Sequence, residues 1–338
     1  MTEPEQGALP SAEWIPIRLY SKDSRFFVDW CHLRGMRLTE PFYDQSIERC
    51  LRHPFSLLFR PQTPVERLVE PRALQGSLAP RGFIFHLSRC GSTLVSQMLA
   101  ALPRNVVLSE AGPIDSVLRA HLHVPGVTDS QRIEWLRGMV AALGRQRHAE
   151  EQHLFIKFDA WHVLELPLLQ RAFPGVPWIF LYRDPVEIMA SHQGHKGAHM
   201  LPGVLEPSLL GLEPEQVKAM ALEEYGARVL AHLCETALKA WRERVSPALL
   251  VHYQQLPEIV LDTLPTHWGV GFTAEELDLM REAARLDAKN PVLPFADDTA
   301  AKQRALKSPA REQVERWVRP LYEALEAVRN EALGPASS

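Results

Sequence analysis

Residues 83–99, with the sequence FIFHLSRCGSTLVSQML, constrain the fold of this chain more than any other stretch. The apolar run at 83–87 predicts a buried strand, the small residues after it predict a tight turn, and a helix is expected over 93–102. A turn of this kind gathers backbone N–H groups and the positive end of a helix dipole at one point. Arg89 adds a fixed charge, and Ser92 and Thr93 add hydroxyl donors, so the turn is suited to hold an anion.

This turn lacks the lysine of a nucleoside-triphosphate loop. Such a loop ends in Gly-Lys-Ser/Thr, where the lysine reaches the outer phosphates and the hydroxyl holds magnesium. Here Gly91 is followed directly by Ser92. We therefore predict a phosphate-type site that differs from an ordinary ATP or GTP loop. The alternative is that the turn merely connects a strand to a helix.

Strands and helices alternate through the rest of the chain. Further strands are expected at 106–108, 153–157, 177–182 and 248–252, and helices at 130–147, 161–172, 214–245, 256–267, 274–286 and 311–333. Pro185 fits the first position of another helix, with Asp184 as its N-cap. The alternation predicts an α/β fold, in which a P-loop-type parallel sheet is flanked by helices and binds ligands at the carboxyl ends of its strands.

Residues 1–75 are expected to form a small amino-terminal appendage, and residues 76–338 the main domain. Apolar alternation from residue 14 and the run at 26–30 predict a hairpin, and the pattern over 44–51 predicts a helix. Four prolines between 61 and 80 indicate a connection. Its aromatic residues are expected to pack this unit; the alternative is that they line a substrate pocket. They are Phe26, Phe27, Trp30, Phe42 and Tyr43.

Composition limits the class of protein. A net charge of −4 over 338 residues gives no general attraction to nucleic acid or to an anionic membrane. The four cysteines, Cys31, Cys50, Cys90 and Cys234, form no CxxC and indicate neither a disulfide framework nor a zinc site. No membrane span and no secretory leader are visible. We expect a soluble cytoplasmic protein without a nucleic-acid partner; the sequence leaves its oligomeric state open.

Charged residues close four of the expected strands: Arg89, Glu110, Lys157 and Arg183. Three cations and one carboxylate in one cleft suit the transfer of an anionic group. The cations neutralise charge on the leaving oxygen, and the carboxylate takes a proton from the attacking hydroxyl. Glu110 is then the predicted base. The alternatives are that Glu110 caps a helix near Pro113 and that Lys157 is an ordinary charged strand end.

Arg183 and Ser191 lie eight positions apart, at a strand end and two turns into the next helix. Both side chains are expected to reach one phosphate, the arginine as a bidentate donor. Together with the turn at Gly91, this predicts two separated anion sites. A donor with phosphates at both ends of its ribose needs that arrangement.

The chain resembles the sulfotransferases that use 3'-phosphoadenosine 5'-phosphosulfate. SRCGSTL at 88–94 resembles their 5'-phosphosulfate loop, and LYRDPVEIMAS at 181–191 resembles their 3'-phosphate motif. The resemblance is closer to the tyrosylprotein and RSGST-type branch, in which Glu110 stands at the catalytic carboxylate and Lys157 at a lysine that contacts the leaving group. It implies in-line sulfuryl transfer to an acceptor hydroxyl, with this co-substrate and without a metal. The implied donor-binding residues are Ser88, Arg89, Cys90, Gly91, Ser92, Thr93, Leu94, Arg183 and Ser191, and the implied catalytic residues are Glu110, Arg89 and Lys157.

Two departures from the family pattern stand out. Cys90 replaces a serine, which removes one hydroxyl donor but leaves the backbone N–H groups of the loop. The late Arg-Lys-Gly loop of cytosolic sulfotransferases is absent. Lys302, Arg304 and Lys307 lie at a comparable position, either as a substitute for that loop or as a solvated basic helix start.

Other functions stay open at this point. A kinase or other phosphotransferase with a divergent loop would need magnesium and ATP, and a non-catalytic nucleotide-binding relative would need neither. His192, His195 and His199 are expected to be loop histidines that line the acceptor pocket, since Gly194 and Gly197 interrupt the helical spacing of a zinc site. The identity of the acceptor is not readable from the residues.

Overall fold

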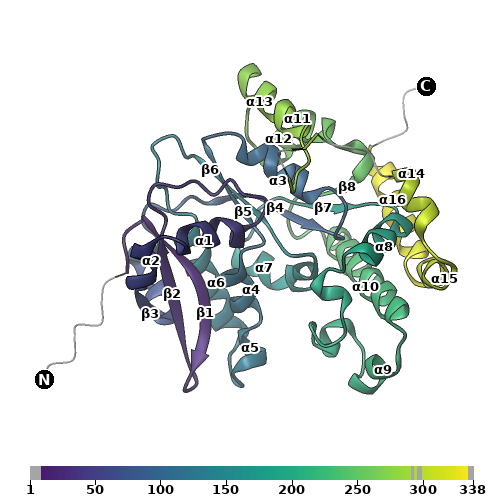
Figure 1. The fold of residues 1–338 in the computed structure, drawn as a ribbon, viewed down its shortest axis with the longest axis horizontal. Helices are drawn as coiled ribbons and strands as arrows, with labels where there is room; N and C mark the ends of the chain where they lie inside the picture. The colour runs from purple at the N-terminus through teal and green to yellow at the C-terminus, as the bar shows by residue number, and fades with distance from the viewer. Residues whose placement is uncertain (1–8, 291–292, 295–298, 334–338) are drawn as a thin grey trace, which may run out of the picture.

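A five-stranded parallel sheet lies at the centre of the fold (Figure 1). The computed structural model describes residues 9–290, 293–294 and 299–333. The sheet order is β5-β6-β4-β7-β8, and every neighbouring pair is parallel. Its strands are β4 (Pro80–His86), β5 (Asn105–Ser109), β6 (His153–Lys157), β7 (Trp178–Tyr182) and β8 (Ala248–His252). The predicted α/β class is confirmed, and the strand that precedes the anion turn is the central one.

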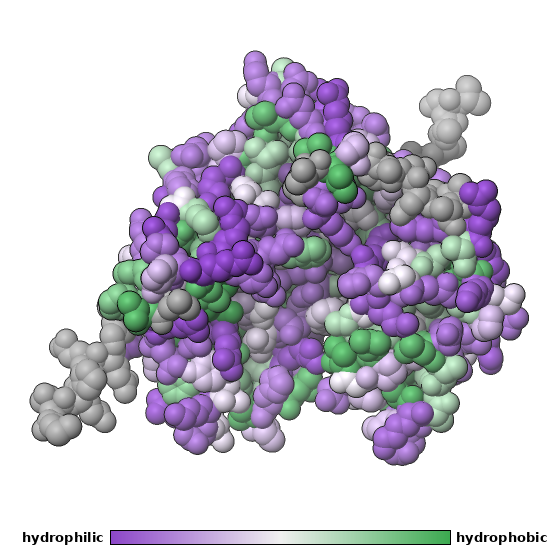
Figure 2. All heavy atoms as spheres, viewed as in Figure 1, coloured by the Kyte–Doolittle hydropathy of each residue, from purple (hydrophilic) through white to green (hydrophobic). Residues whose placement is uncertain are grey.

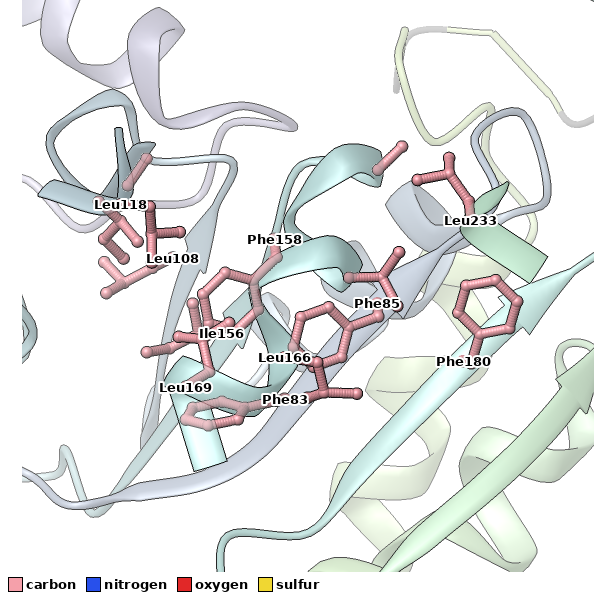
Figure 3. Close-up of a cluster of buried hydrophobic side chains, with 14 of the residues drawn as sticks. Phe83, Phe85, Leu108, Leu118, Ile156, Phe158, Leu166, Leu169, Phe180 and Leu233 are labelled. Carbon is pink, nitrogen blue, oxygen red and sulfur yellow. The ribbon is translucent and has the colours of Figure 1, made fainter. Parts of the chain in front are cut away.

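The sheet is buried on both faces. Along β7, Trp178 and Phe180 belong to one apolar core, and Ile179 and Leu181 belong to the other. Figure 3 shows the first core, where Phe83 and Phe85 of β4 lie beside Phe158. Residues of α6 (Asp129–Leu143), α7 (Leu166–Ala172) and α10 (Leu222–Glu243) complete the first core, and residues of α3 (Ser92–Ala100), α12 (Leu264–Trp268) and α13 (Ala274–Ala284) complete the second. Because both faces of the sheet are buried, successive residues of its strands are apolar and do not alternate with polar ones.

The helix after β7 begins as predicted. In α8 (Pro185–Gly194) the Asp184 carboxylate accepts a hydrogen bond of 2.8 Å from the backbone N–H of Val186, and Pro185 occupies the first turn. The cap and the proline fix where this helix starts, directly after Arg183.

Four expected helices are each divided in the structure, so these predictions are wrong in extent. Residues 161–172 form most of the 3₁₀ helix η3 (Ala160–Glu165) and α7, and residues 256–267 form α11 (Glu258–Asp262) and most of α12. Residues 214–245 form α9 (Pro214–Ala219) and α10, because the backbone between them is extended at Met220 and Ala221. Residues 311–333 form parts of α15 (Ser308–Trp317) and α16 (Arg319–Leu333). Pro320 lies in the first turn of α16, where a helix needs no hydrogen bond from its backbone nitrogen. Because proline has no N–H with which to continue the hydrogen bonding of α15, the preceding helix ends before it.

The amino-terminal unit contains the expected hairpin and helix, with one strand more than predicted. The hairpin is β1 (Trp14–Lys22) with β2 (Arg25–His32), and the helix is α1 (Tyr43–Leu51). The third strand, β3 (Gln62–Pro64), lies where only a connection was expected, and it pairs antiparallel with β2. This three-stranded sheet packs against α4 (Gly112–Leu118) and α6, so its buried residues join the first core. The boundary at residue 75 stays a prediction.

The remaining elements are short. They are α2 (Pro54–Leu58), α5 (Ala120–His123), α11 (Glu258–Asp262), α14 (Thr299–Ala305) and the 3₁₀ helices η1 (Val65–Val69), η2 (Pro71–Leu74), η3 (Ala160–Glu165), η4 (Ala198–Met200), η5 (Pro207–Leu210) and η6 (Tyr253–Gln255). Exposed Phe55, Leu58 and Phe59 lie in and after α2, where Figure 2 shows apolar residues at the left of this face. Among the described residues, no helix is both long and apolar enough to span a membrane.

Candidate active site

The turn between β4 and α3 has a left-handed backbone at three of its residues. The φ angles are 62° at Ser88, 51° at Arg89 and 89° at Gly91. Non-glycine residues adopt this region at a cost, so surrounding contacts must hold it. The backbone N–H of Ser88 donates to His86 Nδ1 at 3.0 Å. A Cβ at Gly91 would lie 2.5 Å from Leu256 Cδ1, and residues with side chains rarely adopt a φ of 89°, so the turn favours glycine at this position.

Cys90 holds the same turn against the neighbouring strand. Its buried thiol donates to the Leu181 carbonyl oxygen, with sulfur and oxygen 3.2 Å apart. Burial raises the pKa of the Cys90 thiol to about 12, so it stays protonated and unreactive near neutral pH. The cysteine therefore supports the loop through β7, as a residue of the fold.

The carboxylate and the lysine predicted at neighbouring strand ends are in direct contact. Glu110 follows β5, Lys157 ends β6, and Lys157 Nζ lies 2.6 Å from Glu110 Oε1. The Lys157 side chain is 0 % exposed, and its Nζ also lies 3.4 Å from Thr93 Oγ1. The alternative that Glu110 caps a helix is not supported, because Ala111 is the N-cap of α4 and no side-chain cap bond is present there.

Charge neighbours set the protonation of Glu110. Burial acts to raise the pKa of this carboxyl, but attraction to Lys157 and the contact with His86 outweigh it and hold the pKa well below its ordinary range. Glu110 is therefore ionised near neutral pH, and it is a weak base for as long as Lys157 is paired with it.

Two adjoining compartments open above these strand ends. The Glu110 compartment, of about 460 Å³, is lined by Phe42, His86, Ser88, Glu110, Asp159, Ala160, Trp161, His195, Lys196, Gly197, Ala198 and His199. The Arg183 compartment, of about 260 Å³, is lined by Cys90, Gly91, Leu94, Arg183, Ser191, Tyr253, Leu286, Asp287, Ala288 and Lys302. Four residues line both: Arg89, Ser92, Thr93 and Lys289. The turn thus forms the floor at which the two compartments meet.

The structure places every predicted site residue at this pair of compartments. Lys157 lies beneath them, bonded to Glu110. Arg183 lies over the ring of Tyr253, 3.9 Å from its centroid, and donates to the carboxylate of Glu187. Of the three late basic residues, all within the described part of the chain, Lys302 lines the Arg183 compartment, whereas Arg304 and Lys307 are exposed and do not.

Several site residues were not predicted. His86 ends β4 and Asp159 lies two residues after β6, so the strand-end rule that selected Lys157 also applies to them. Burial raises the pKa of Asp159 to about 7. Lys289 comes from the turn after α13, and no local pattern marks it. Burial, then the positive charges of Arg89 and Lys157, lower the pKa of Lys289 to about 8.

Two of the three histidines predicted as pocket-lining loop residues, His195 and His199, line the Glu110 compartment. The prediction is wrong for His192, which is a buried residue of α8 and does not line the compartment; its ring lies edge to face with that of His199, with centroids 5.4 Å apart. Burial lowers the pKa of His192 to about 4 and that of His199 to about 3, so both rings are neutral. Within the described ranges, the one group with metal-ligand spacing is Asp115, Asp159 and His162, where His162 Nε2 already bonds Asp115 Oδ1 at 2.8 Å.

Comparison with known proteins finds structural similarity at low identity. A sulfotransferase from Mycobacterium avium, STF9, has a TM-score of 0.44 and 14% identity over 71% of this chain and 79% of its own. A sulfotransferase from Alicyclobacillus acidocaldarius has a TM-score of 0.41 and 14% identity over 74% of this chain and 95% of its own. A sulfotransferase from Mycobacterium tuberculosis H37Rv, STF1, has a TM-score of 0.37 and 14% identity over 74% of this chain and 82% of its own. No family model and no curated protein matches the sequence.

Removal of the buried ammonium tests the ion pair. Lys157→Met leaves the partly buried Glu110 carboxylate, 23 % exposed, without its main partner, and we expect the free energy of unfolding at about pH 7 to fall by about 3 kcal/mol, the lower end of the range for a broken buried pair. Lys218→Met is the matched control, because Lys218 Nζ lies 2.7 Å from Glu215 Oε1 in a largely exposed pair. That variant should lose less than about 1 kcal/mol in denaturant unfolding.

The difference between wild type and Lys157→Met should depend on pH. A carboxyl whose pKa falls on folding adds stability that is fully present above its unfolded pKa of about 4.3 and is lost as the pH drops toward its folded pKa. In folded Lys157→Met, burial without the lysine raises the pKa of Glu110 relative to wild type, so the stability gap should shrink as the pH falls through that raised pKa and go on shrinking toward the lowered folded pKa of wild type. A gap that is constant over this range would contradict the ion pair.

Proposed function

We propose that this chain is a sulfotransferase, which moves a sulfuryl group from 3'-phosphoadenosine 5'-phosphosulfate to an acceptor hydroxyl. The observation that carries the proposal is the Glu110–Lys157 pair beneath the junction of two compartments that share Arg89, Ser92 and Thr93. A group-transfer enzyme needs this arrangement, because the donor and the acceptor must meet at one point where charge develops.

The Arg183 compartment suits the donor. Arg89, Arg183, Lys289 and Lys302 line it, and Asp287 is the one carboxylate among the described lining residues. The loop N–H groups and the start of α3 would hold the 5'-phosphate, and Gly91 leaves the backbone open to close approach. Arg183 and Ser191, with Lys302, would hold the 3'-phosphate, and Tyr253 supports the guanidinium from below.

The Glu110 side of the junction suits the chemistry of transfer. Glu110 would take the proton from the acceptor hydroxyl as the new oxygen–sulfur bond forms. The bond between sulfur and the bridging oxygen breaks, and its electron pair stays on the 5'-phosphate. Lys157 and Arg89 would stabilise that charge. When Lys157 turns to the bridging oxygen, the suppression of the Glu110 pKa is relieved, and the carboxylate becomes a stronger base.

The acceptor would lie in the Glu110 compartment, whose lining includes the aromatic residues Phe42 and Trp161. Phe42 belongs to the amino-terminal unit and lies over Lys157, with its ring centroid 4.8 Å from Nζ. Residues 1–75 therefore contribute a wall of the proposed acceptor site. A volume of about 460 Å³ fits a small molecule or one side group of a larger acceptor.

Binding of adenosine 3',5'-bisphosphate tests the donor site. Calorimetric titration without magnesium should show binding, and Lys302→Met should weaken it about tenfold or more, because a charge-assisted hydrogen bond to phosphate is lost. The matched control Arg304→Met removes a nearby exposed cation and should leave the affinity unchanged. Binding of ATP with magnesium in place of the bisphosphate would favour a phosphotransferase and refute the proposal.

Transfer of labelled sulfuryl groups tests the reaction. A panel of phenols, sugars and aliphatic alcohols is offered with ³⁵S-labelled donor, and the best acceptor is kept. With it, Glu110→Gln should lower turnover about a hundredfold or more while bisphosphate affinity is retained, because a general base is lost. The control Glu134→Gln, on an exposed position of α6, should be as active as wild type. Unchanged turnover in Glu110→Gln would refute the assignment of the base.

A further inference from the structure

His86 connects the anion turn to the carboxylate of Glu110. It is the last residue of β4 and is 5 % exposed. Its Nδ1 accepts the backbone N–H of Ser88 at 3.0 Å, which uses the lone pair on that nitrogen. The ring proton of a neutral imidazole must then be on Nε2. Nε2 lies 3.4 Å from Glu110 Oε1 without forming a hydrogen bond of normal geometry, so among the described residues this buried N–H has no hydrogen-bond partner and the carboxylate is the acceptor within reach.

The surroundings keep this imidazole neutral. Burial is the largest effect and lowers the pKa of His86; the contact with Glu110 comes next and raises it, the positive charge of Lys157 lowers it again, and the net shift is downward. A second histidine ring, that of His199 in η4, interacts electrostatically with His86, and it is also neutral. His86 therefore offers Glu110 an N–H group without a second positive charge.

The two residues that the ring contacts are both strained. Ser88 has a φ of 62° and Glu110 a φ of 55°, and neither is a glycine. Such conformations persist where contacts over-determine them. One imidazole accepts a hydrogen bond from the backbone of Ser88 and lies beside the carboxylate of Glu110, so it links the anion turn to the carboxylate.

We propose that His86 is a positioning residue, which couples the geometry of the anion turn to the orientation of the Glu110 carboxylate. The proposal rests on the proposed transfer reaction. While Lys157 is paired with Glu110, Lys157 Nζ and His86 Nε2 both lie close to Glu110 Oε1. Once Lys157 turns to the donor, the carboxylate can close onto the Nε2–H of His86, which then holds it in place. Arg89 and Lys289 also act on Glu110 electrostatically, and a neutral imidazole adds no further positive charge to theirs, so the pKa of Glu110 can rise.

Two substitutions separate the two contacts of the ring. In His86→Asn the amide oxygen can replace Nδ1, so the contact to Ser88 is kept and the contact to Glu110 is lost. In His86→Gln the amide nitrogen can replace Nε2, so the contact to Glu110 is kept and the contact to Ser88 is lost. We expect His86→Asn to bind adenosine 3',5'-bisphosphate like wild type and to lose about 10- to 100-fold in turnover. We expect His86→Gln to be impaired mainly in bisphosphate binding.

The pH profile distinguishes positioning from a purely structural role. A hydrogen bond to an ionised carboxylate lowers its pKa, so the acid limb of kcat/KM for the acceptor, measured with saturating donor so that Lys157 has left Glu110, should move to higher pH in His86→Asn. An acid limb that stays in place, with equal loss of bisphosphate affinity in both variants, would overturn the proposal.

A spectroscopic readout needs no acceptor. In ¹⁵N NMR of the full chain, the His86 ring should be neutral with its proton on Nε2 from about pH 6 to about pH 8, and Glu110→Gln should shift Nε2 more than Nδ1. A proton on Nδ1, or a ring insensitive to Glu110→Gln, would refute the link. Wild type that fails to bind the bisphosphate but shows these shifts would refute the proposed function and leave His86 coupled to Glu110.

Discussion

The buried pair of Lys157 and Glu110 is the interaction on which the site depends. A fully buried ammonium is costly to desolvate, and the carboxylate 2.6 Å away offsets that cost. The pair requires β5 and β6 to be neighbours, and the contact of Lys157 with Thr93 requires β4 to lie next to β6. The strand order of the sheet therefore fixes which charged side chains meet at the site.

Much of the fold could be predicted because its signals are local. Apolar runs at β6 and β7 end in charged residues, and the carboxyl ends of parallel strands share one edge, so Glu110, Lys157 and Arg183 were found from the sequence. The helix start at Pro185 was also a local signal. No local sequence pattern shows which strands are neighbours, and whether Glu110, Lys157 and Arg183 lie close together depends on that order.

What the sequence did not reveal comes from distant segments or from packing. Lys289 enters the site from the turn after α13, which no local pattern marks. Phe42 was expected to pack the amino-terminal unit, with a pocket role only as the alternative, and it lines the Glu110 compartment because that unit packs beside the sheet. The break between α9 and α10 follows from extended backbone at Met220 and Ala221, which no proline or glycine marks. The low pKa of Glu110 likewise depends on tertiary neighbours.

A crystal structure with adenosine 3',5'-bisphosphate bound tests the central claim most directly, namely that the lysine beneath the turn changes partner when the donor arrives. In the bound structure Lys157 Nζ should lie within hydrogen-bond distance of a 5'-phosphate oxygen and should have left Glu110 Oε1, while the carboxylate has closed onto His86 Nε2. A bisphosphate bound elsewhere, or one bound at the turn with the Lys157–Glu110 pair intact, would contradict the account.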